Sequence, residues 1–213
     1  MKSLRMTAGW PDTASLGWDR FRIALVKTES DLRAMHAVDD AFYAPDFFDY
    51  ELKLRWWKAY RYCFMVVLDG DTVVGNLSIH PVKEADITEV LADRMATRDL
   101  PSLTLEELQH TPCRWWHISN LLILEQYRGP HLEALAFLLA QTLNLYAESP
   151  YLTFPLSISG RAFSMASRRI MEKFGFTEIG VETQYGPAFV LTAPDKNSLF
   201  AKVARTGIDR WLA

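Results

Sequence analysis

Cysteine is scarce in this 213-residue chain, which contains only Cys63 and Cys113. The two lie far apart and show no CxxC spacing, so the sequence predicts neither a disulfide framework nor a zinc site. His36, His80 and His110 also lack the spacing of metal ligands, and we assign them no role. We therefore expect no bound metal and a protein of the reducing cytoplasm.

Long apolar runs and an excess of basic residues are also missing. The first 20 residues contain Lys2 and Arg5 but no apolar signal-peptide core, and no later run is long enough to cross a bilayer. The 23 Lys and Arg against 26 Asp and Glu give a formal net charge of -3. Nucleic-acid binding normally requires clustered positive charge. The sequence thus predicts that the protein binds neither membranes nor nucleic acids.

The composition is that of an ordinary globular protein, with 49% hydrophobic and 23% charged residues. A chain of this length is long enough for one substantial core and too short for two average domains. Residues 1–20 contain glycine and proline without periodicity, so we expect an N-terminal extension there. Residues 21–213 are predicted to form a single domain with an insertion at about 83–110.

Hydrophobic periodicity predicts an alternation of strands and helices. Ser30 is the expected N-cap of the first helix, and Thr104 and Glu107 have the spacing of a capping box. The nearly continuous apolar second half of segment 115–125 indicates a central strand that is buried on both faces. The expected elements in chain order are strand 21–26, helices 30–43 and 48–60, hairpin 64–82, helical turns in 83–110, strand 115–125, helix 131–148, strand 152–158, helix 162–176, strands 177–180 and 188–193, and helix 197–213.

This order, together with two local motifs, resembles the GNAT acyltransferase superfamily over roughly residues 21–192. Tyr127-Arg128-Gly129 is similar to the start of the family's pyrophosphate-binding loop, and Met171-Glu172-Lys173-Phe174-Gly175-Phe176 resembles its YEKxGF ending. The resemblance implies an α/β fold with a mixed central sheet of about seven strands flanked by helices. It also implies an N-acyltransferase that moves an acyl group, acetyl in the first instance, from acetyl-CoA or another acyl-CoA to an amine by direct attack.

The loop before helix 131–148 is the predicted cofactor site. Unpaired N–H groups and the helix dipole favour a phosphate at such a position, and the resemblance assigns diphosphate binding to Arg128, Gly129, His131 and Leu132. The loop departs from the family pattern because His131 and Glu133 stand where glycines are usual. An alternative register starts at Gln126, and a further alternative is an ordinary helix start with proline at its first position.

Candidate catalytic groups lie on the central strand. His117 stands eleven residues before Arg128, where histone acetyltransferases of the superfamily carry a general-base glutamate. An unperturbed imidazole suits proton acceptance near neutrality, although a structural core histidine is the alternative. By resemblance, the backbone N–H of Ile123, with Leu121 nearby, stabilises the oxyanion, and Leu121 and Ile123 also bind the acyl-CoA. Regular alternation would place His117 and Ser119 on one face of the strand and Asn120 on the other.

The usual proton donor of the family is missing. A tyrosine is common where this chain has Met171, and an asparagine where it has Ser164. Methionine cannot donate a proton. Tyr185, Tyr151 or solvent could replace the missing acid.

The first two predicted helices contain many aromatic and acidic residues. The aromatic residues are expected to form an acceptor pocket or, alternatively, to fill the core. Asp39, Asp40, Asp46 and Asp49 either attract a cationic amine or form a solvated face.

The predicted partner is a small-molecule or peptide amine, and an acyl carrier protein is an alternative acyl donor. A noncatalytic binding module of the same fold remains the rival to an enzyme. The sequence leaves the oligomeric state open, a dimer included.

Overall fold

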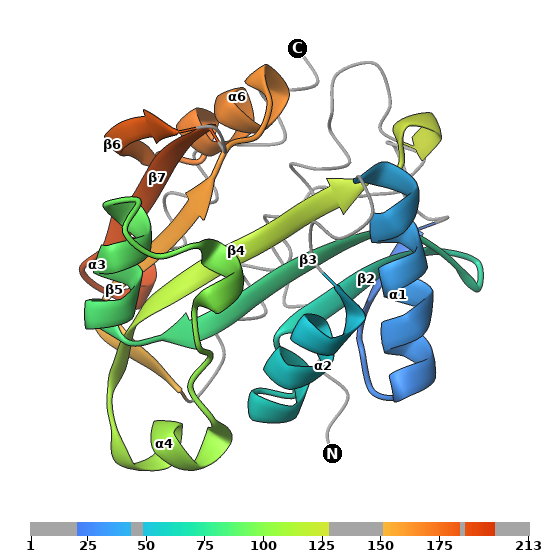
Figure 1. The fold of residues 1–213 in the computed structure, drawn as a ribbon, viewed down its shortest axis with the longest axis horizontal. Coiled ribbons are helices and arrows are strands. Elements are labelled where there is room, and N and C mark those ends of the chain that lie inside the picture. The colour runs from blue at the N-terminus through green and yellow to red at the C-terminus, as the bar shows by residue number, and fades with distance from the viewer. Residues whose placement is uncertain (1–20, 44–48, 128–150, 184–185, 199–213) are drawn as a thin grey trace.

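The computed structural model describes residues 21–43, 49–127, 151–183 and 186–198. These residues form a seven-stranded mixed sheet in the order β1-β2-β3-β4-β5-β7-β6 (Figure 1). Strands β4 and β5 are parallel, and the other neighbouring strands are antiparallel. The predicted α/β fold with about seven strands is confirmed. The strands are β1 (Phe21–Leu25), β2 (Phe64–Asp69), β3 (Thr72–Val82), β4 (Cys113–Ile123), β5 (Leu152–Arg161), β6 (Thr177–Thr183) and β7 (Gly186–Ala193).

The described helices lie between these strands in the predicted order. They are α1 (Glu29–Phe42), α2 (Tyr50–Ala59), α3 (Glu84–Leu91), η3 (Thr97–Asp99), α4 (Leu105–His110), η4 (Glu125–Tyr127) and α6 (Met165–Lys173). Helical turns therefore occupy segment 83–110 as expected. None of the described helices is both long enough and apolar enough to span a bilayer. The predicted extension 1–20, helix 131–148 and nearly all of helix 197–213 lie outside the described residues.

Capping side chains fix where the helices begin. The Thr104–Glu107 capping box at the start of α4 is confirmed. The expected cap of α1 at Ser30 is wrong, because Thr28 caps this helix. The Thr28 hydroxyl accepts from the Asp31 N–H at 3.1 Å, and the Asp31 carboxylate accepts from the Thr28 N–H at 2.9 Å. This reciprocal pair satisfies two backbone donors. Ser30 could not form the same pair, because it is directly next to Asp31 in the sequence.

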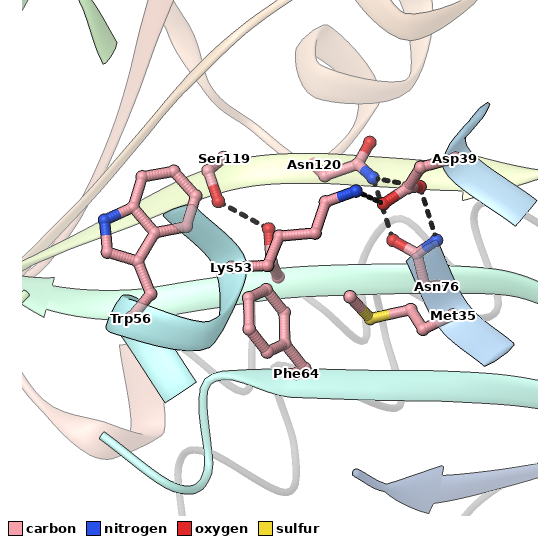
Figure 2. A pocket seen from close by; sticks show the side chains of 9 residues that line it. Met35, Asp39, Lys53, Trp56, Phe64, Asn76, Ser119 and Asn120 are labelled. Atoms are coloured by element: carbon pink, nitrogen blue, oxygen red, sulfur yellow. Dashed lines mark hydrogen bonds and ion pairs between the residues drawn. The ribbon is translucent and has the colours of Figure 1, made fainter. Parts of the chain in front are cut away.

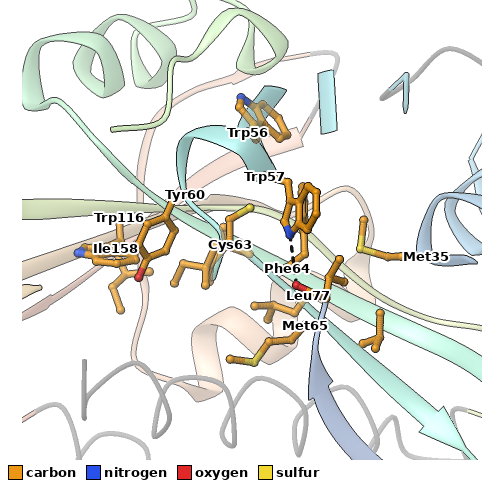
Figure 3. Close-up of a cluster of buried hydrophobic side chains, with 14 of the residues drawn as sticks. Met35, Trp56, Trp57, Tyr60, Cys63, Phe64, Met65, Leu77, Trp116 and Ile158 are labelled. Atoms are coloured by element: carbon orange, nitrogen blue, oxygen red, sulfur yellow. Dashed lines mark hydrogen bonds between the residues drawn. The ribbon is translucent and has the colours of Figure 1, made fainter. Parts of the chain in front are cut away.

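The two faces of the sheet differ in polarity. One face packs apolar side chains such as Met65, Leu77 and Trp116, which belong to the main buried cluster (Figure 3). The opposite face, under α1 and α2, carries alternating polar residues on β3, namely Asn76, Ser78 and His80, each buried. Because a strand alternates its side chains, β3 is apolar toward one side and polar toward the other. Helices α1 and α2 therefore cover a polar face of the sheet.

Strand β4 contains a bulge that changes its alternation. Ile118 lies opposite Ile79 and Asn120 lies opposite Ser78, so Ser119 has no partner of its own in β3. Directly opposite residues in a sheet point to the same face, and Asn120 therefore shares the polar face with His117. The prediction that Asn120 lies on the other face is wrong, because it assumed a regular strand.

Two glycines allow close packing at the centre of the sheet, and their substitutions are expected to differ. A Cβ at Gly75 would lie 2.5 Å from the Leu122 carbonyl oxygen, whereas a Cβ at Gly160 would lie 2.5 Å from the flexible Met171 Cε. We expect Gly75→Ala to lower the free energy of unfolding by about 1–3 kcal/mol through overpacking, and Gly160→Ala to cost less. Urea denaturation of both variants tests this, and equal losses would contradict it.

Candidate active site

Strands β4 and β5 separate in the middle of the sheet. Their ladder ends where Ile118 pairs with Gly160, whereas β4 continues to Ile123. Figure 1 shows the two strands diverging beyond this point. Backbone polar groups on the β5 side of β4 are thus not used by β5 in this stretch, and such groups can bind a carbonyl oxygen. Leu121 and Ile123 lie in this stretch, and their catalytic and binding roles remain predictions.

His117 lies just before the separation and is 1% exposed. Its Nδ1 is 2.9 Å from the Ser159 hydroxyl, and that hydroxyl donates to the Trp116 carbonyl at 3.4 Å. Because a serine hydroxyl has a single proton to donate, this arrangement assigns the imidazole proton to Nδ1. The Nε2 atom then carries the lone pair that could accept a proton.

The protonation state of His117 follows from its surroundings. Burial lowers the pKa of His117 to about 3, and the nearby Arg161 guanidinium acts in the same direction. The imidazole is therefore neutral at pH 7, which is the form required of a base. A pKa this low makes it a weaker proton acceptor than a free imidazole.

His80 lies opposite His117 on the neighbouring strand. Its ring centroid is 4.7 Å from that of Trp56 and 5.9 Å from that of His117. It is 0% exposed, and neither ring nitrogen has a hydrogen-bond partner among the described residues. Burial, and secondly His117, hold the pKa of His80 well below its usual value. The sequence analysis assigned no role to His80.

These two buried neutral histidines predict acid sensitivity. The unfolded chain takes up protons below a pKa of about 6.5, whereas folded His117 stays neutral until about pH 3. Stability is therefore full above pH 6.5 and falls as the pH is lowered toward 3. At pH 5, His117 alone lowers the free energy of unfolding by about 2 kcal/mol relative to neutral pH. The buried His80 lowers it further.

Urea denaturation at pH 7, 6 and 5 measures this loss. His80→Phe should flatten the pH dependence because it removes one titrating group. Replacement of the exposed His110 by Gln is the matched control and should leave the pH dependence unchanged. Equal unfolding free energies of the unmodified protein at pH 7 and pH 5 would count against buried neutral histidines.

A buried ion pair joins α1 and α2 above the polar face. The Lys53 ammonium lies 2.8 Å from Asp39 Oδ2, and each residue is only 3% exposed. Asp39 Oδ1 accepts from the side-chain amides of Asn76 at 2.7 Å and Asn120 at 2.8 Å (Figure 2). The expectation that Asp39 belongs to a solvated acidic face is therefore wrong. The sequence showed no sign that these four side chains would meet.

Further polar contacts extend this network. The Tyr43 hydroxyl donates to Asn120 Oδ1 at 2.9 Å. His36 Nδ1 lies 2.8 Å from the Lys53 ammonium, which can only donate, so Nδ1 is the acceptor. Burial, and secondly Lys53, lower the pKa of His36. The remaining proton of neutral His36 then lies on Nε2, 3.4 Å from Asp40 Oδ2.

A small cavity lies beside the ion pair. It offers about 10 Å³, roughly the room that one water needs. The ion pair, both amides and the hydroxyls of Ser78 and Ser119 line its polar side, and these two hydroxyls are hydrogen-bonded to each other. Figure 2 shows these side chains converging from two helices and two strands, with Trp56, Phe64 and Met35 completing the wall.

The aromatic residues of α1, α2 and the turn after α2 mainly pack in the core. Trp56, Trp57 and Tyr60 are buried, and the Trp57 indole donates to the Val26 carbonyl at 3.2 Å (Figure 3). Phe42 at 44% and Tyr62 at 45% exposure lie on the surface. Only Trp56 among these five also lines the cavity. An aromatic acceptor pocket remains a prediction.

Met171 and Ser164, which stand where the family usually has its proton donor, have structural roles here. Met171 is buried and its methyl group packs at Gly160. The Ser164 hydroxyl accepts from the Ser167 N–H at 3.1 Å and so caps α6. Tyr151 is partly buried beside the core, and Tyr185 lies outside the described residues.

The predicted diphosphate loop also lies outside the described residues. This applies to Arg128, Gly129, His131 and Leu132. Their role in holding acyl-CoA remains a prediction. The site described here is therefore limited to β4 and to the polar face under α1 and α2.

Comparisons with known proteins identify the fold. No family model matches the sequence, and no curated protein does. Among solved structures, the loading GNATL domain of CurA from Lyngbya majuscula is 13% identical with a TM-score of 0.61, covering 81% of this chain and 97% of that domain. Mosquito arylalkylamine N-acetyltransferase like 5b is 17% identical with a TM-score of 0.56, covering 81% and 100%. Ard1 from Thermoplasma volcanium is 12% identical with a TM-score of 0.55, covering 83% and 99%. The strand order, the separation of β4 from β5 and these likenesses agree: the chain has the GNAT fold.

Proposed function

We propose that this protein is an N-acyltransferase that moves an acyl group from acyl-CoA to an amine. The observation that carries the proposal is the opening between β4 and β5, where the ladder stops at Ile118 and Gly160 while β4 continues. A thioester placed in this opening would meet backbone donors of β4 on one side and the polar face under α1 and α2 on the other. His117 lies at the closed end of the opening.

The proposed reaction is a direct attack. The amine nitrogen forms a bond to the thioester carbon, the carbonyl oxygen becomes an oxyanion, and the bond from carbon to sulfur then breaks. The N–H of Ile123, with Leu121 nearby, donates to the oxyanion. The nitrogen loses one proton, which His117 Nε2 accepts, and the thiolate takes up a proton from solvent. The products are an amide and a free thiol.

The thiolate needs little help to leave. Met171 and Ser164 offer no acid, since the first is a core side chain and the second a helix cap. A thiol is far more acidic than an alcohol, so its anion is stable enough to leave without a dedicated donor. The absence of an acid at these two positions is therefore compatible with turnover.

The known neighbours support an amine acceptor. They include an arylalkylamine N-acetyltransferase like protein and an agmatine N-acetyltransferase, the latter 14% identical with a TM-score of 0.56. We take from them the class of acceptor alone. The acyl group is proposed to be acetyl, and acyl-CoA is proposed as its donor.

Thermal unfolding with acetyl-CoA and longer acyl-CoAs tests donor binding. A ligand at 100 times its Kd stabilises the folded state by about 2.7 kcal/mol, which should raise Tm by several degrees. Release of free thiol from acetyl-CoA on addition of a primary amine tests transfer. Binding without thiol release from any amine would favour the noncatalytic module, to which the structural roles of Met171 and Ser164 also point.

A carrier protein is the second candidate donor. One neighbour is a loading domain, and a carrier presents its acyl group on a phosphopantetheine arm without the adenine nucleotide. Acetyl-pantetheine therefore serves as the test donor. Thiol release from acetyl-pantetheine but not from acetyl-CoA would favour the carrier.

A further inference from the structure

The side chain of His117 is held by a hydrogen bond to the strand next to its own. Its Nδ1 atom lies 2.9 Å from the Ser159 hydroxyl. Ser159 stands directly opposite His117 in the parallel ladder of β4 and β5, and paired residues of neighbouring strands project to the same face of a sheet. The register of the two strands therefore brings this hydroxyl to the imidazole.

The Ser159 hydroxyl is itself held in one orientation. It donates its proton to the Trp116 carbonyl at 3.4 Å, so its lone pairs face His117 Nδ1. Ser159 is 0% exposed and His117 is 1% exposed, and bulk water therefore does not compete for either group. Because a neutral imidazole has one N–H, this geometry holds the proton on Nδ1 and leaves the lone pair on Nε2.

The other described neighbours of His117 do not select its tautomer. His80 lies opposite on β3, and neither of its ring nitrogens has a hydrogen-bond partner in the described part of the chain. The Arg161 guanidinium donates to two backbone carbonyls. Without the Ser159 hydroxyl, His117 Nδ1 would be buried without a partner in either tautomer, so no hydrogen bond would favour one of them.

The position of this pair relates the imidazole to the opening in the sheet. His117 and Ser159 form the pair just before Ile118 and Gly160, where the ladder of β4 and β5 ends (Figure 1). Strand β5 thus supplies the hydroxyl that orients the imidazole directly beside the proposed thioester site.

We propose that Ser159 is the positioning residue of the proposed base: its hydroxyl keeps the proton of His117 on Nδ1 and so keeps the Nε2 lone pair available for the proton of the attacking amine. The catalytic part of this inference rests on the proposed function. Ser159 itself exchanges no proton with the substrate and forms no covalent bond to the acyl group, since its own proton is directed to a backbone carbonyl.

Nitrogen NMR of the imidazole rings tests the tautomer without any turnover. The chain contains five histidines, and the spectrum of His117→Gln identifies the His117 signals by their loss. At pH 7 the unmodified protein should carry the His117 proton on Nδ1, whereas Ser159→Ala should show a mixture of both tautomers. A proton on Nε2 in the unmodified protein, or the same tautomer in both proteins, would overturn the inference.

Initial rates of thiol release test the catalytic consequence. With acetyl-CoA and a primary amine, Ser159→Ala should lower kcat by about tenfold or more and leave KM for acetyl-CoA nearly unchanged. Ser159→Thr keeps the hydroxyl and should retain most of the activity. Ser157→Ala is the matched control: Ser157 lies two residues earlier on the same face of β5, is partly buried and makes no side-chain hydrogen bond to a described residue. Equal kcat values for the two alanine variants would contradict the proposal.

A double variant separates positioning of the base from a general effect on the fold. In the His117→Ala background, Ser159→Ala should cause no further loss of kcat, because residues that act as one unit are not additive. A further tenfold loss would show that Ser159 acts on some other group and would overturn the inference. If no amine releases thiol but the NMR result holds, the proposed function fails, and the control of the His117 tautomer by Ser159 stands.

Discussion

Lys53→Met is expected to lower the free energy of unfolding by about 3–5 kcal/mol, the cost of leaving a buried charge without its partner. The reason lies in Asp39, which is 3% exposed and whose Oδ2 faces the Lys53 ammonium at 2.8 Å. Removal of the ammonium leaves a carboxylate inside the protein that only two amides stabilise. Urea denaturation at pH 7 measures the loss, and the temperature of unfolding should fall in parallel.

Two controls separate this effect from a general loss of helix stability. Lys58 lies on the same helix but is exposed, so Lys58→Met should change stability by less than about 0.5 kcal/mol. Lys53→Met with Asp39→Asn removes both charges and should recover most of the loss, because a buried ion pair often contributes little net stability. A double variant as unstable as the single one would show that packing, not charge, causes the loss.

His117→Ala is expected to reduce kcat for acyl transfer by about 10²–10⁴, the usual contribution of a positioned base. The substitution removes the Nε2 lone pair. Among the described histidines, only His80, which lies opposite His117 on β3, is also close to the end of the β4–β5 ladder. Stabilisation by acetyl-CoA should persist in the variant, since the predicted diphosphate loop is untouched. Initial rates of thiol release at saturating donor measure the effect.

The pH profile of acyl transfer should not show the ionisation of His117. With a pKa of about 3, His117 cannot cause a loss of activity between pH 8 and 5, so any acid limb in that range should follow the pKa of the acceptor amine. His110→Ala, at an exposed position, is the matched control and should keep full activity. If His117→Ala also keeps full activity, the base assignment is wrong.

The sequence predicted the fold well because its signals are local. Alternation and turn residues located the hairpin of β2 and β3, where Gly70 adopts a φ of 59°. The run at 115–125 correctly indicated the central strand. The Glu-Lys-Phe-Gly-Phe segment and the element order gave the fold family, although overall identity to the solved neighbours is only 12–17%. Each of these patterns lies within a few neighbouring residues.

The candidate site was much less predictable because it is built from distant residues. Asn76, Ser78 and His80 alternate with apolar residues on β3, a pattern that normally indicates a face exposed to water. The packing of α1 and α2 over that face is what buries them. Lys53 and Asp39 likewise have the appearance of ordinary helix surface charges. A usable signal was present in β4, where His117, Ser119 and Asn120 interrupt an apolar strand beside the polar positions of β3.

The extra residue at Ser119 has a consequence for the opening itself. A bulge bends its strand and increases the local twist, and this one follows directly after Ile118, the last residue of β4 that pairs with β5. A chain without Ser119 would still place Asn120 opposite Ser78, so almost every side chain would keep its direction. Because β5 ends at Arg161, one residue beyond Gly160, the straightened β4 could add only one further pair to this ladder. The bulge thus helps to set the direction in which β4 leaves β5 at the proposed thioester site.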